Sequence, residues 1–369
     1  MAGCYIPIPA GDRCNKMRLL VTGVAGFIGS NFVYYWLSHH STDEIIGLDN
    51  LTYAGNLENL ESIPAGQKKR FTFVKGDICD PDSVRDIFER DSVDCVVNFA
   101  AESHVDRSIH DPQVFLRSNI LGMANLLDAA RRSWKKGDDW LPGKKFLQVS
   151  TDEVYGSLGA EGYFTETTSL DPHSPYSASK ASADLLAKAY HDTFGMPVLI
   201  TRCSNNYGPY QFPEKLIPLM IHNCLHHQPL PVYGDGKQVR DWLYVEDHCR
   251  AIDRVLESGR LGEVYNIGGN NERYNIDIVK LIIGIIREET GDQGINNSLI
   301  RFVKDRPGHD RRYAINSSKI QQELGWKPFV TFEEGIRSTI RWYLDHQEWM
   351  QHVISGEYLQ FYDKNYQNR

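Results

Sequence analysis

Between residues 18 and 202, short apolar runs rich in β-branched residues alternate with longer segments of helical periodicity. The apolar runs lie at 18–23, 44–49, 71–77, 94–100, 145–150 and 197–202. Helical patterns separate them, the clearest at 27–40 and 177–194. Such alternation is typical of βαβ units, in which helices cover both faces of a parallel sheet. The pattern predicts an α/β fold with a Rossmann-type, doubly wound parallel sheet.

The pattern changes after Arg202, where Pro, Gly and Tyr become frequent. Helix-like segments follow at 215–227, 246–257, 276–290 and 332–346, and 263–269 has the pattern of one more buried strand. We therefore expect a smaller α/β substrate lobe that is interleaved with the first domain. The predicted division is an N-terminal tail at 1–16, a first domain at 17–204 with a return near 239–269, and a lobe made of 205–238 and 270–369.

Composition narrows the range of partners. The 369 residues are 41% hydrophobic and carry a formal charge of −8, whereas nucleic acids and anionic membranes select a basic face. No apolar run approaches the ~20 residues that span a bilayer, and the first residues lack the hydrophobic stretch of a secretion signal. Seven scattered cysteines without a C-x-x-C favour reduced thiols, and no metal site is expected. We expect a cytoplasmic protein with no nucleic-acid or membrane partner.

A cofactor motif follows the first predicted strand. In VTGVAGFIGS, Gly23, Gly26 and Gly29 are spaced three apart before a helix, so the backbone can approach a pyrophosphate at the helix N-terminus. Asp49 ends the second strand, where a carboxylate binds the adenosine ribose and repels a 2′-phosphate. The motif and Asp49 predict that the cofactor is NAD and that the domain at 17–204 binds it. Asp77, in GDI after the third strand, is either an adenine contact or a turn residue.

Two further motifs contain candidate catalytic residues. In SPYSASK, Tyr176 and Lys180 lie one helical turn apart, and Ser174 is a predicted N-cap. Tyrosine, with a pKa near ~10, becomes a base at neutral pH only when neighbouring positive charge lowers that pKa, as an ammonium and the nicotinamide ring can. The strand at 145–150 ends in Thr151 and two adjacent carboxylates, Asp152 and Glu153. Repulsion disfavours that pair, which indicates a functional role.

These motifs occur with LTYAGN, AAESHVDRSI, STDEVYG, SNNYGPYQFPEKLIPL, RDWLYVEDH, YNIGG, DRPGHDRRYAI and SGEYLQFYDKNY. Together they resemble the extended short-chain dehydrogenase/reductase family and, within it, the dTDP-glucose 4,6-dehydratases. The resemblance runs from about Met17 over almost the whole chain. It implies a lyase that oxidises C4 of the sugar, eliminates water across C5 and C6 and returns the hydride to C6. A homodimer and a place in deoxysugar synthesis, such as that of rhamnose, are also implied.

The resemblance implies a role for each catalytic candidate. Tyr176 takes the proton of the sugar 4-hydroxyl, Thr151 hydrogen-bonds nearby, and Lys180 holds the nicotinamide ribose. Glu153 removes the C5 proton and Asp152 protonates the departing 6-hydroxyl, because one elimination needs a base and an acid. The environment must therefore push the pKa values of these two carboxyl groups apart.

The resemblance also implies binding residues. Those expected to touch NAD, besides the glycines and aspartates above, Tyr176 and Lys180, are Phe27, Ile28, Asn50, Leu51, Thr52, Ile78, Ala100, Ala101, Ser118 and Asn206. Those expected to line the nucleotide-sugar site are Ser103, Thr151, Asn205, Lys215, Leu216, Pro231, Tyr233, Arg240, Asn275, Arg306 and Tyr366. Arg306, His309 and Arg240 supply cations for a diphosphate, although pairing with Asp241, Asp305 or Asp310 is an alternative.

Three alternatives remain. The chain could be a GDP-mannose or CDP-glucose 4,6-dehydratase, which performs the same elimination. It could be a UDP-sugar epimerase or decarboxylase, although neither needs a general acid such as Asp152 at the 6-position. A non-catalytic NAD-bound scaffold would have no reason to combine the sequence Ser150–Glu153, here called the STDE motif, with Tyr176 and Lys180. The nucleotide base rests on resemblance alone.

Overall fold

The computed structural model describes residues 16–305 and 309–354. Its centre is a seven-stranded sheet in the order β12-β8-β7-β4-β1-β2-β3, with every neighbouring pair parallel. The strands are β1 (Arg18–Thr22), β2 (Glu44–Asp49), β3 (Phe71–Lys75), β4 (Cys95–Asn98), β7 (Lys145–Thr151), β8 (Val198–Cys203) and β12 (Val264–Ile267). The predicted doubly wound sheet, including the late strand near 263–269, is confirmed.

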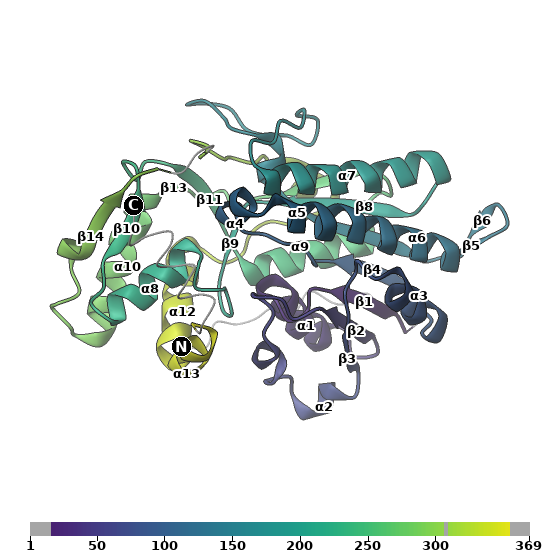
Figure 1. Ribbon diagram of the computed structural model, residues 1–369, viewed down its shortest axis with the longest axis horizontal. Helices are drawn as coiled ribbons and strands as arrows, with labels where there is room; N and C mark the ends of the chain where they lie inside the picture. Colours follow the sequence, from purple (N-terminus) through teal and green to yellow (C-terminus); the bar gives the residue numbers. More distant parts are fainter. Residues whose placement is uncertain (1–15, 306–308, 355–369) are drawn as a thin grey trace.

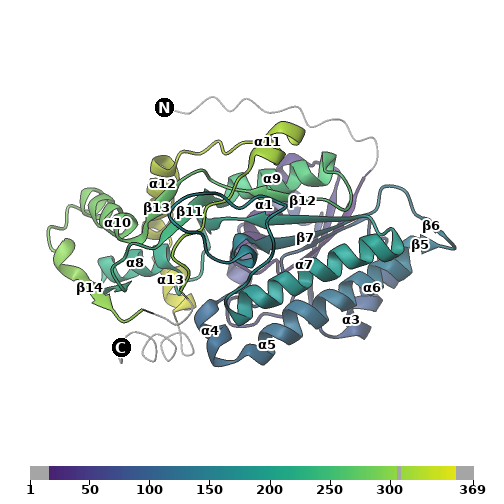
Figure 2. The same cartoon turned by 90° about the horizontal axis from the view of Figure 1, so that it is seen from above.

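Helices cover both faces of this sheet (Figures 1 and 2). One layer contains α3 (Pro81–Arg90), α6 (Met123–Trp134) and α7 (Pro175–Phe194), and the other contains α1 (Phe27–His39), α9 (Val245–Ser258) and α11 (Ser318–Leu324). Successive side chains of a strand point to opposite faces, so Leu19 and Val21 pack with the second layer and Leu20 with the first. Both faces are therefore buried, which explains the continuous apolar runs in the sequence.

Between β4 and α6 the chain forms α4 (Val105–His110), α5 (Pro112–Leu116) and a π-helical segment, Arg117–Gly122. The shorter elements are α2 (Ala65–Lys68), β5 (Lys135–Lys136), β6 (Asp139–Trp140) and the 3₁₀ turns Leu57–Leu60, Asp152–Tyr155 and Asn297–Leu299.

A smaller lobe lies beside the carboxyl ends of the main strands (Figure 1). It contains β10 (Leu230–Tyr233) paired in parallel with β14 (Ile300–Val303), together with α8 (Leu216–Leu225), α10 (Asn275–Thr290), α12 (Phe332–Asp345) and α13 (Gln347–Val353). A three-stranded sheet of β13 (Glu272–Tyr274), β11 (Val239–Tyr244) and β9 (Asn205–Tyr207) stands next to it.

The packing links the two predicted parts of the chain in two places. Residues 239–244, which were expected to return to the first domain, form β11 of the three-stranded sheet, and Leu243 of this strand packs in the core of the first domain whereas Trp242 packs in that of the lobe. Conversely, α11 falls within the expected lobe segment 270–369 and packs on α9 and β12 through Ile320. The reason is that α11 adds the buried Ile320 to the first domain's core, a long-range contact that local periodicity does not reveal.

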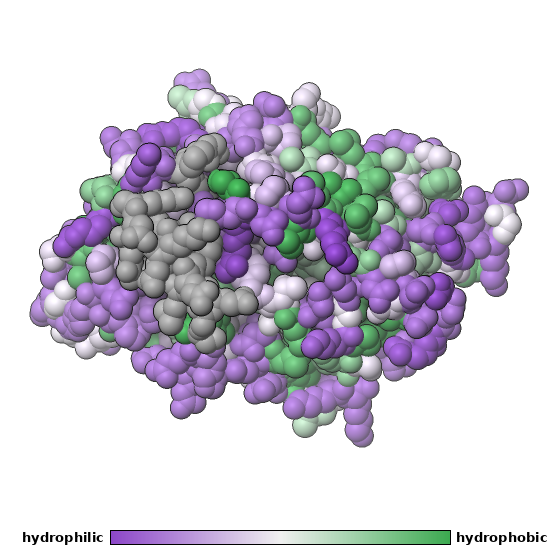
Figure 3. All heavy atoms as spheres, viewed as in Figure 1, coloured by the Kyte–Doolittle hydropathy of each residue, from purple (hydrophilic) through white to green (hydrophobic). Residues whose placement is uncertain are grey.

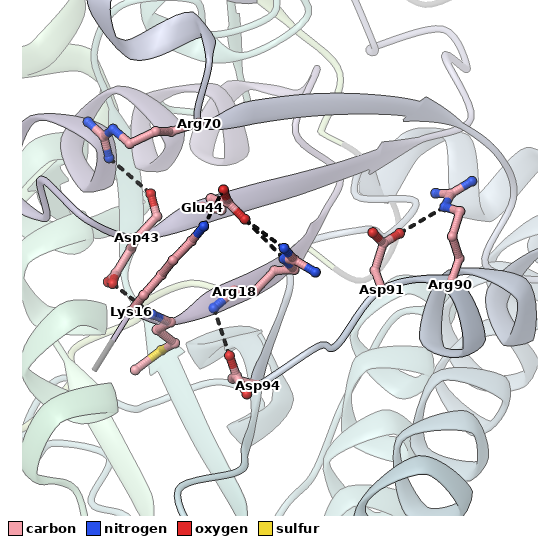
Figure 4. A network of polar contacts seen from close by, with 9 residues as sticks. Lys16, Arg18, Asp43, Glu44, Arg70, Arg90, Asp91 and Asp94 are labelled. Atoms are coloured by element: carbon pink, nitrogen blue, oxygen red, sulfur yellow. Dashed lines mark hydrogen bonds and ion pairs between the residues drawn. The ribbon is translucent and has the colours of Figure 1, made fainter. Parts of the chain in front are cut away.

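The amino ends and the carboxyl ends of the main-sheet strands carry different side chains. At the amino ends, Arg18 of β1 donates to Glu44 of β2 at 2.9 Å, and its backbone N–H donates to Asp94 at 2.9 Å (Figure 4). These charges pair with one another and tie the strand starts together. At the carboxyl ends lie the glycine turn after β1, Asp49 and the STDE motif. Ligands of open α/β sheets bind at that edge.

Five described cysteines, Cys79, Cys95, Cys203, Cys224 and Cys249, are free thiols, as predicted. Among the described residues, no helix has both the length and the apolar character needed to cross a membrane.

Candidate active site

Two adjoining cavities open at the carboxyl ends of the main-sheet strands. The larger, of about 310 Å³, is the cofactor cavity, and the smaller, of about 160 Å³, is the lobe cavity. Five residues belong to the walls of both: Ser103, Glu153, Asn205, Glu214 and Lys215. The two cavities therefore meet beside Glu153, and a ligand in one can touch a ligand in the other.

The glycine turn fits a dinucleotide. Gly23 has φ +71°, and a Cβ there would lie 2.8 Å from the backbone nitrogen of Ala100. A Cβ on Gly29 would lie 2.1 Å from the carbonyl oxygen of Gly23, so α1 can begin against the turn only with glycine at this position. Gly26 caps α1 without a side-chain hydrogen bond. Backbone N–H groups of the first turn are thus available to a pyrophosphate.

The carboxyl ends of β2 and β3 supply the acidic side of the cofactor cavity. Asp49 lies in its wall and accepts hydrogen bonds from the backbone N–H groups of Ala25 and Leu51, at 2.9 and 2.8 Å. Burial raises its pKa, opposed by those bonds. Asp77 accepts a hydrogen bond from the backbone N–H of Cys79 at 2.8 Å, which is the predicted turn role, and it also lines the cavity. The adenine contact stays a prediction.

Most expected NAD contacts do lie in this wall: Gly23, Gly26, Phe27, Ile28, Gly29, Asp49, Asn50, Thr52, Asp77, Ile78, Ala100, Ala101, Ser118, Tyr176, Lys180 and Asn206. Leu51 is the exception. It adopts φ +56° and contributes its backbone N–H to Asp49, so its side chain takes no part in the wall.

Helix α7 positions the candidate base. Ser174 forms a capping box with Ser177, and Pro175 occupies the first turn, so the predicted N-cap is confirmed. Tyr176 is buried in the cavity wall, with its ring 6.3 Å from that of Phe115. One turn later Lys180 donates from Nζ to the carbonyl oxygen of Val149 at 2.7 Å.

The expected lowering of the Tyr176 pKa is not present in this structure. Burial raises the pKa of Tyr176 well above its ordinary value, and the charge of Glu153 adds to the effect. A hydrogen bond with Thr151 acts in the opposite direction. Burial also lowers the pKa of Lys180, whose ammonium points to Val149. Activation of the phenol by Lys180 and the positive nicotinamide ring stays a prediction.

The STDE motif turns its two carboxylates in different directions. Thr151 ends β7, and a 3₁₀ turn starts at Asp152, capped by the Thr151 hydroxyl. Glu153 faces the junction of the cavities, whereas Asp152 is buried behind the wall. Thr151 Oγ1 lies 3.3 Å from Asp152 Oδ1, and Asp152 Oδ2 has no partner among the described residues. Burial and the charge of Glu153 raise the pKa of Asp152 well above its ordinary value, as the predicted acid requires.

The lobe cavity gathers most of the expected nucleotide-sugar residues: Ser103, Asn205, Lys215, Leu216, Pro231, Tyr233, Arg240, Asn275 and His309. Arg306 and Tyr366 lie outside the described residues. Arg240 donates to the carbonyl oxygens of Val239 and Asp310, and His309 Nδ1 lies 2.6 Å from Asp305 Oδ1. The side-chain oxygens of Asn205 and Asn275 are buried and accept no hydrogen bond from the described part of the chain. A polar ligand can satisfy both.

Sequence reasoning missed Glu214. Its side chain is 1% exposed and belongs to both walls, where it accepts from Tyr53 and Arg107 at 3.0 Å each. The signal was a pair of adjacent charged residues, Glu214 and Lys215, between two prolines in the segment QFPEKLIP. Trp242 was also missed, although it lines the lobe cavity and its indole N–H donates to no described residue.

No group of three or more His, Cys, Asp or Glu side chains within 16–305 and 309–354 could hold a metal ion.

Comparison with known proteins agrees with this arrangement. The chain matches the GDP-mannose 4,6 dehydratase family over residues 20–339. It is 55% identical to the dTDP-glucose 4,6-dehydratase of Xanthomonas campestris pv. campestris over 342 residues, which cover 92% of this chain and 96% of the relative. The Bacillus anthracis dTDP-glucose 4,6-dehydratase, solved in complex with NAD, has a TM-score of 0.81 and 50% identity, covering 91% of this chain and 99% of that one.

The dTDP-glucose 4,6-dehydratase of Streptomyces venezuelae, solved with NAD and a further ligand, has a TM-score of 0.84 and 47% identity, covering 91% of this chain and 100% of that one. The likeness thus includes both the cofactor cavity and the lobe. By sequence and by structure, the chain belongs to the dTDP-glucose 4,6-dehydratases of the NAD-dependent dehydratase and epimerase group.

Proposed function

We propose that this protein converts dTDP-glucose to dTDP-4-keto-6-deoxyglucose with NAD as its resident cofactor. The observation that carries the proposal is the position of Glu153, which lies in the walls of both cavities beside Tyr176 and next to Asp152, whose pKa is raised by burial and by the charge of Glu153. An acid and a base are thus placed where a sugar in the lobe cavity would meet a nicotinamide in the cofactor cavity.

The cofactor cavity fits NAD because its glycine turn has no room for a Cβ and Asp49 stands where the adenosine ribose would bind. When bound, NAD accepts a hydride from C4 of the sugar and later returns it to C6. Tyr176 takes the proton of the 4-hydroxyl, and the Thr151 hydroxyl orients that group. Lys180 holds the nicotinamide ribose.

Glu153 removes the proton at C5, which the 4-ketone has made acidic. Asp152 supplies a proton to the departing 6-hydroxyl, and its raised pKa supports this role because the group must carry that proton at neutral pH. Asp152 lies behind the wall, and the Thr151 hydroxyl, which lines the cavity, donates to its Oδ1 at 3.3 Å. To relay the proton, this hydroxyl would have to turn, accept the proton of Asp152 and donate its own to the 6-hydroxyl.

The lobe cavity would hold the nucleotide. Arg240, Lys215 and His309 supply positive charge for the diphosphate, with Arg306 as a further candidate from the sequence. Asn205 and Asn275 have buried oxygens that need donors, which the sugar hydroxyls and the base can provide. Leu216, Pro231 and Tyr233 offer apolar contacts, and Ser103 lies near the sugar.

The GDP-mannose and CDP-glucose dehydratases are the nearest rivals, because they share the elimination. Relatives at 47–55% identity are dTDP-glucose enzymes, which supports dTDP-glucose over these bases. Epimerases and decarboxylases share the fold but need no proton donor at C6. For the same reason a non-catalytic NAD-bound scaffold would gain nothing from the raised pKa of Asp152.

The test offers dTDP-, UDP-, CDP- and GDP-glucose and GDP-mannose and follows loss of one water by mass spectrometry. We expect turnover of dTDP-glucose. With dTDP-glucose deuterated at C4, the label should appear in the product methyl group, and in heavy water one deuterium should enter at C5. Label that remains at C4, or turnover of only another nucleotide sugar, would contradict the proposal.

We further propose a homodimer. Apolar side chains gather over α5 and α7 in Figure 3, and these two helices and the π-helical segment contact one another. The exposed apolar residues of these elements include Val114 and Leu116 of α5, Leu121 of the π-helical segment and Leu185 of α7. The last two are each 60% exposed, and a face of this kind is typical of an interface between subunits. The free thiols favour a reducing compartment, the cytoplasm, as the place of action. The 4-keto-6-deoxy product would supply deoxysugar synthesis such as that of rhamnose.

A further inference from the structure

Tyr53, Arg107 and Glu214 form a cluster where the two cavities meet. The Tyr53 hydroxyl donates to Glu214 Oε1 at 3.0 Å, and Arg107 Nε donates to Oε2 at 3.0 Å. The guanidinium carbon of Arg107 lies 3.6 Å from the centre of the Tyr53 ring. Each oxygen of one buried carboxylate is therefore held by a different donor, and the two donors also stack on each other.

The three residues come from separate parts of the chain. Tyr53 stands in the loop after β2, between Thr52 and Ala54, which both line the cofactor cavity. Arg107 belongs to α4, and Glu214 lies two residues before α8, the helix that enters the lobe. The cluster thus joins a loop that lines the cofactor cavity to the segment that leads into the lobe.

Further contacts extend this connection on both sides. The loop after β2 is tied to the glycine turn, because the backbone N–H of Asn56 donates to the carbonyl oxygen of Ala25 at 3.0 Å. On the lobe side, the Tyr53 ring packs edge-on against Phe212 at 5.6 Å, and Lys215 Nζ donates to the carbonyl oxygen of Ser103 at 3.0 Å. The glycine turn, the loop, the cluster and the start of α8 are therefore one continuous set of contacts.

Separating the loop from the lobe would leave a buried carboxylate without its donors, which is costly. Both segments form part of the wall of the cofactor cavity, so parting them would widen that cavity. We propose that Tyr53, Arg107 and Glu214 form a latch that retains NAD and that couples its retention to occupation of the lobe cavity by the nucleotide part of the substrate. The second half of this inference rests on the proposed function.

The latch can be tested with Tyr53→Phe, which removes the hydroxyl and keeps the ring beneath Arg107. The holoenzyme is loaded with radiolabelled NAD and diluted into excess unlabelled NAD, and the label retained is followed with and without saturating dTDP. We expect Tyr53→Phe to release NAD about tenfold faster than the native protein, the typical effect of one hydrogen bond to a charged group. In the native protein dTDP should slow release, and in the variant that slowing should be lost.

A matched control is Tyr35→Phe. The Tyr35 hydroxyl also donates to a carboxylate, Asp253 Oδ2, at 3.0 Å, but neither residue belongs to a cavity wall. Its variant should release NAD at the native rate and keep the effect of dTDP. Arg107→Gln should behave like Tyr53→Phe; if it fails to fold, Tyr53→Phe alone decides the question.

Native release from Tyr53→Phe, or equally fast release from Tyr35→Phe, would overturn the latch. The coupling would be overturned if Tyr53→Phe released NAD faster but dTDP slowed that release by the same factor as in the native protein. It would also be overturned if dTDP did not slow the release of NAD from the native protein. The measurement requires no turnover. A protein that retains NAD through Tyr53 but does not dehydrate dTDP-glucose would therefore contradict the proposed function and leave retention by the latch supported.

Discussion

Among single residues, Asp152 shows most clearly how a catalytic requirement opposes stability. Burial and the charge of Glu153 raise its pKa, so the unfolded chain loses this proton at a lower pH than the folded protein does. Stability therefore falls as pH rises from about 4, the ordinary pKa of aspartate, towards the folded value. Asp152→Asn places a neutral amide in the same volume. We expect it to raise Tm at pH 7 by about 2 °C or more, and by less near pH 4.

Thermal unfolding followed by circular dichroism between pH 4 and pH 8 measures this difference. A gain in Tm that is the same at both ends of the range would show that ionisation of Asp152 is not its cause. The same variant should lose dehydration, because the amide cannot supply the proton to the 6-hydroxyl.

Tyr176 and Glu153 act at different stages, so their variants should fail differently. Tyr176→Phe removes the proton acceptor for C4 oxidation, and we expect NAD to stay bound with no absorbance of reduced nicotinamide after dTDP-glucose is added. Glu153→Gln removes only the later base, so reduced nicotinamide should accumulate while no water is lost. Rapid-mixing absorbance with mass spectrometry follows both. Cofactor reduction at the native rate in Tyr176→Phe would remove that residue from its proposed role.

Residues recognised from the sequence are those with short-range signatures. Gly23, Gly26 and Gly29 are constrained by one turn, and the spacing of Tyr176 and Lys180 is set by one helix. Glu214 was missed because its partners lie 161 and 107 residues away, at Tyr53 and Arg107. The inward turn of Asp152 was also unpredictable, since it depends on the packing of the 3₁₀ turn after β7.

At the scale of elements, the start of α7 determines where the Tyr176 hydroxyl lies. Ser174→Ala breaks the capping box, which should cost about 1 kcal/mol of stability and allow the first turn to fray. Because Tyr176 is the second residue of that helix, we expect kcat to fall at least about tenfold. Thr331→Ala breaks the same kind of capping box at α12, which supplies no cavity residue.

Urea unfolding and steady-state kinetics on both variants separate the two effects. Thr331→Ala should lose similar stability and keep native kcat. Equal kcat losses in the two variants would mean that the position of Tyr176 does not depend on its own cap.

Elements with a strong local period were predicted well, and those that exist because of distant contacts were not. The strands of the main sheet are apolar on both faces and helix α1 is long, so their patterns are unambiguous. Helix α11 has seven residues and only one, Ile320, is buried. Its place on the first domain follows from a core contact that no sequence window contains.

For the whole molecule, the proposed dimer face and the active site share one short helix. Val114 and Leu116 of α5 point outward with 42% and 38% exposure, whereas Phe115 between them is buried against Tyr176. A partner subunit that covers this face would therefore hold α5, and through Phe115 the ring of Tyr176, in place.

We expect Leu185→Glu to produce monomers in sedimentation velocity and to lower kcat with little change in NAD content. Phe302→Glu is the matched control, because Phe302 is 62% exposed on β14 of the lobe and should leave a dimer with native kcat. A native protein that sediments as a monomer would contradict the dimer, and monomers with native kcat would show that α5 holds Tyr176 without a partner.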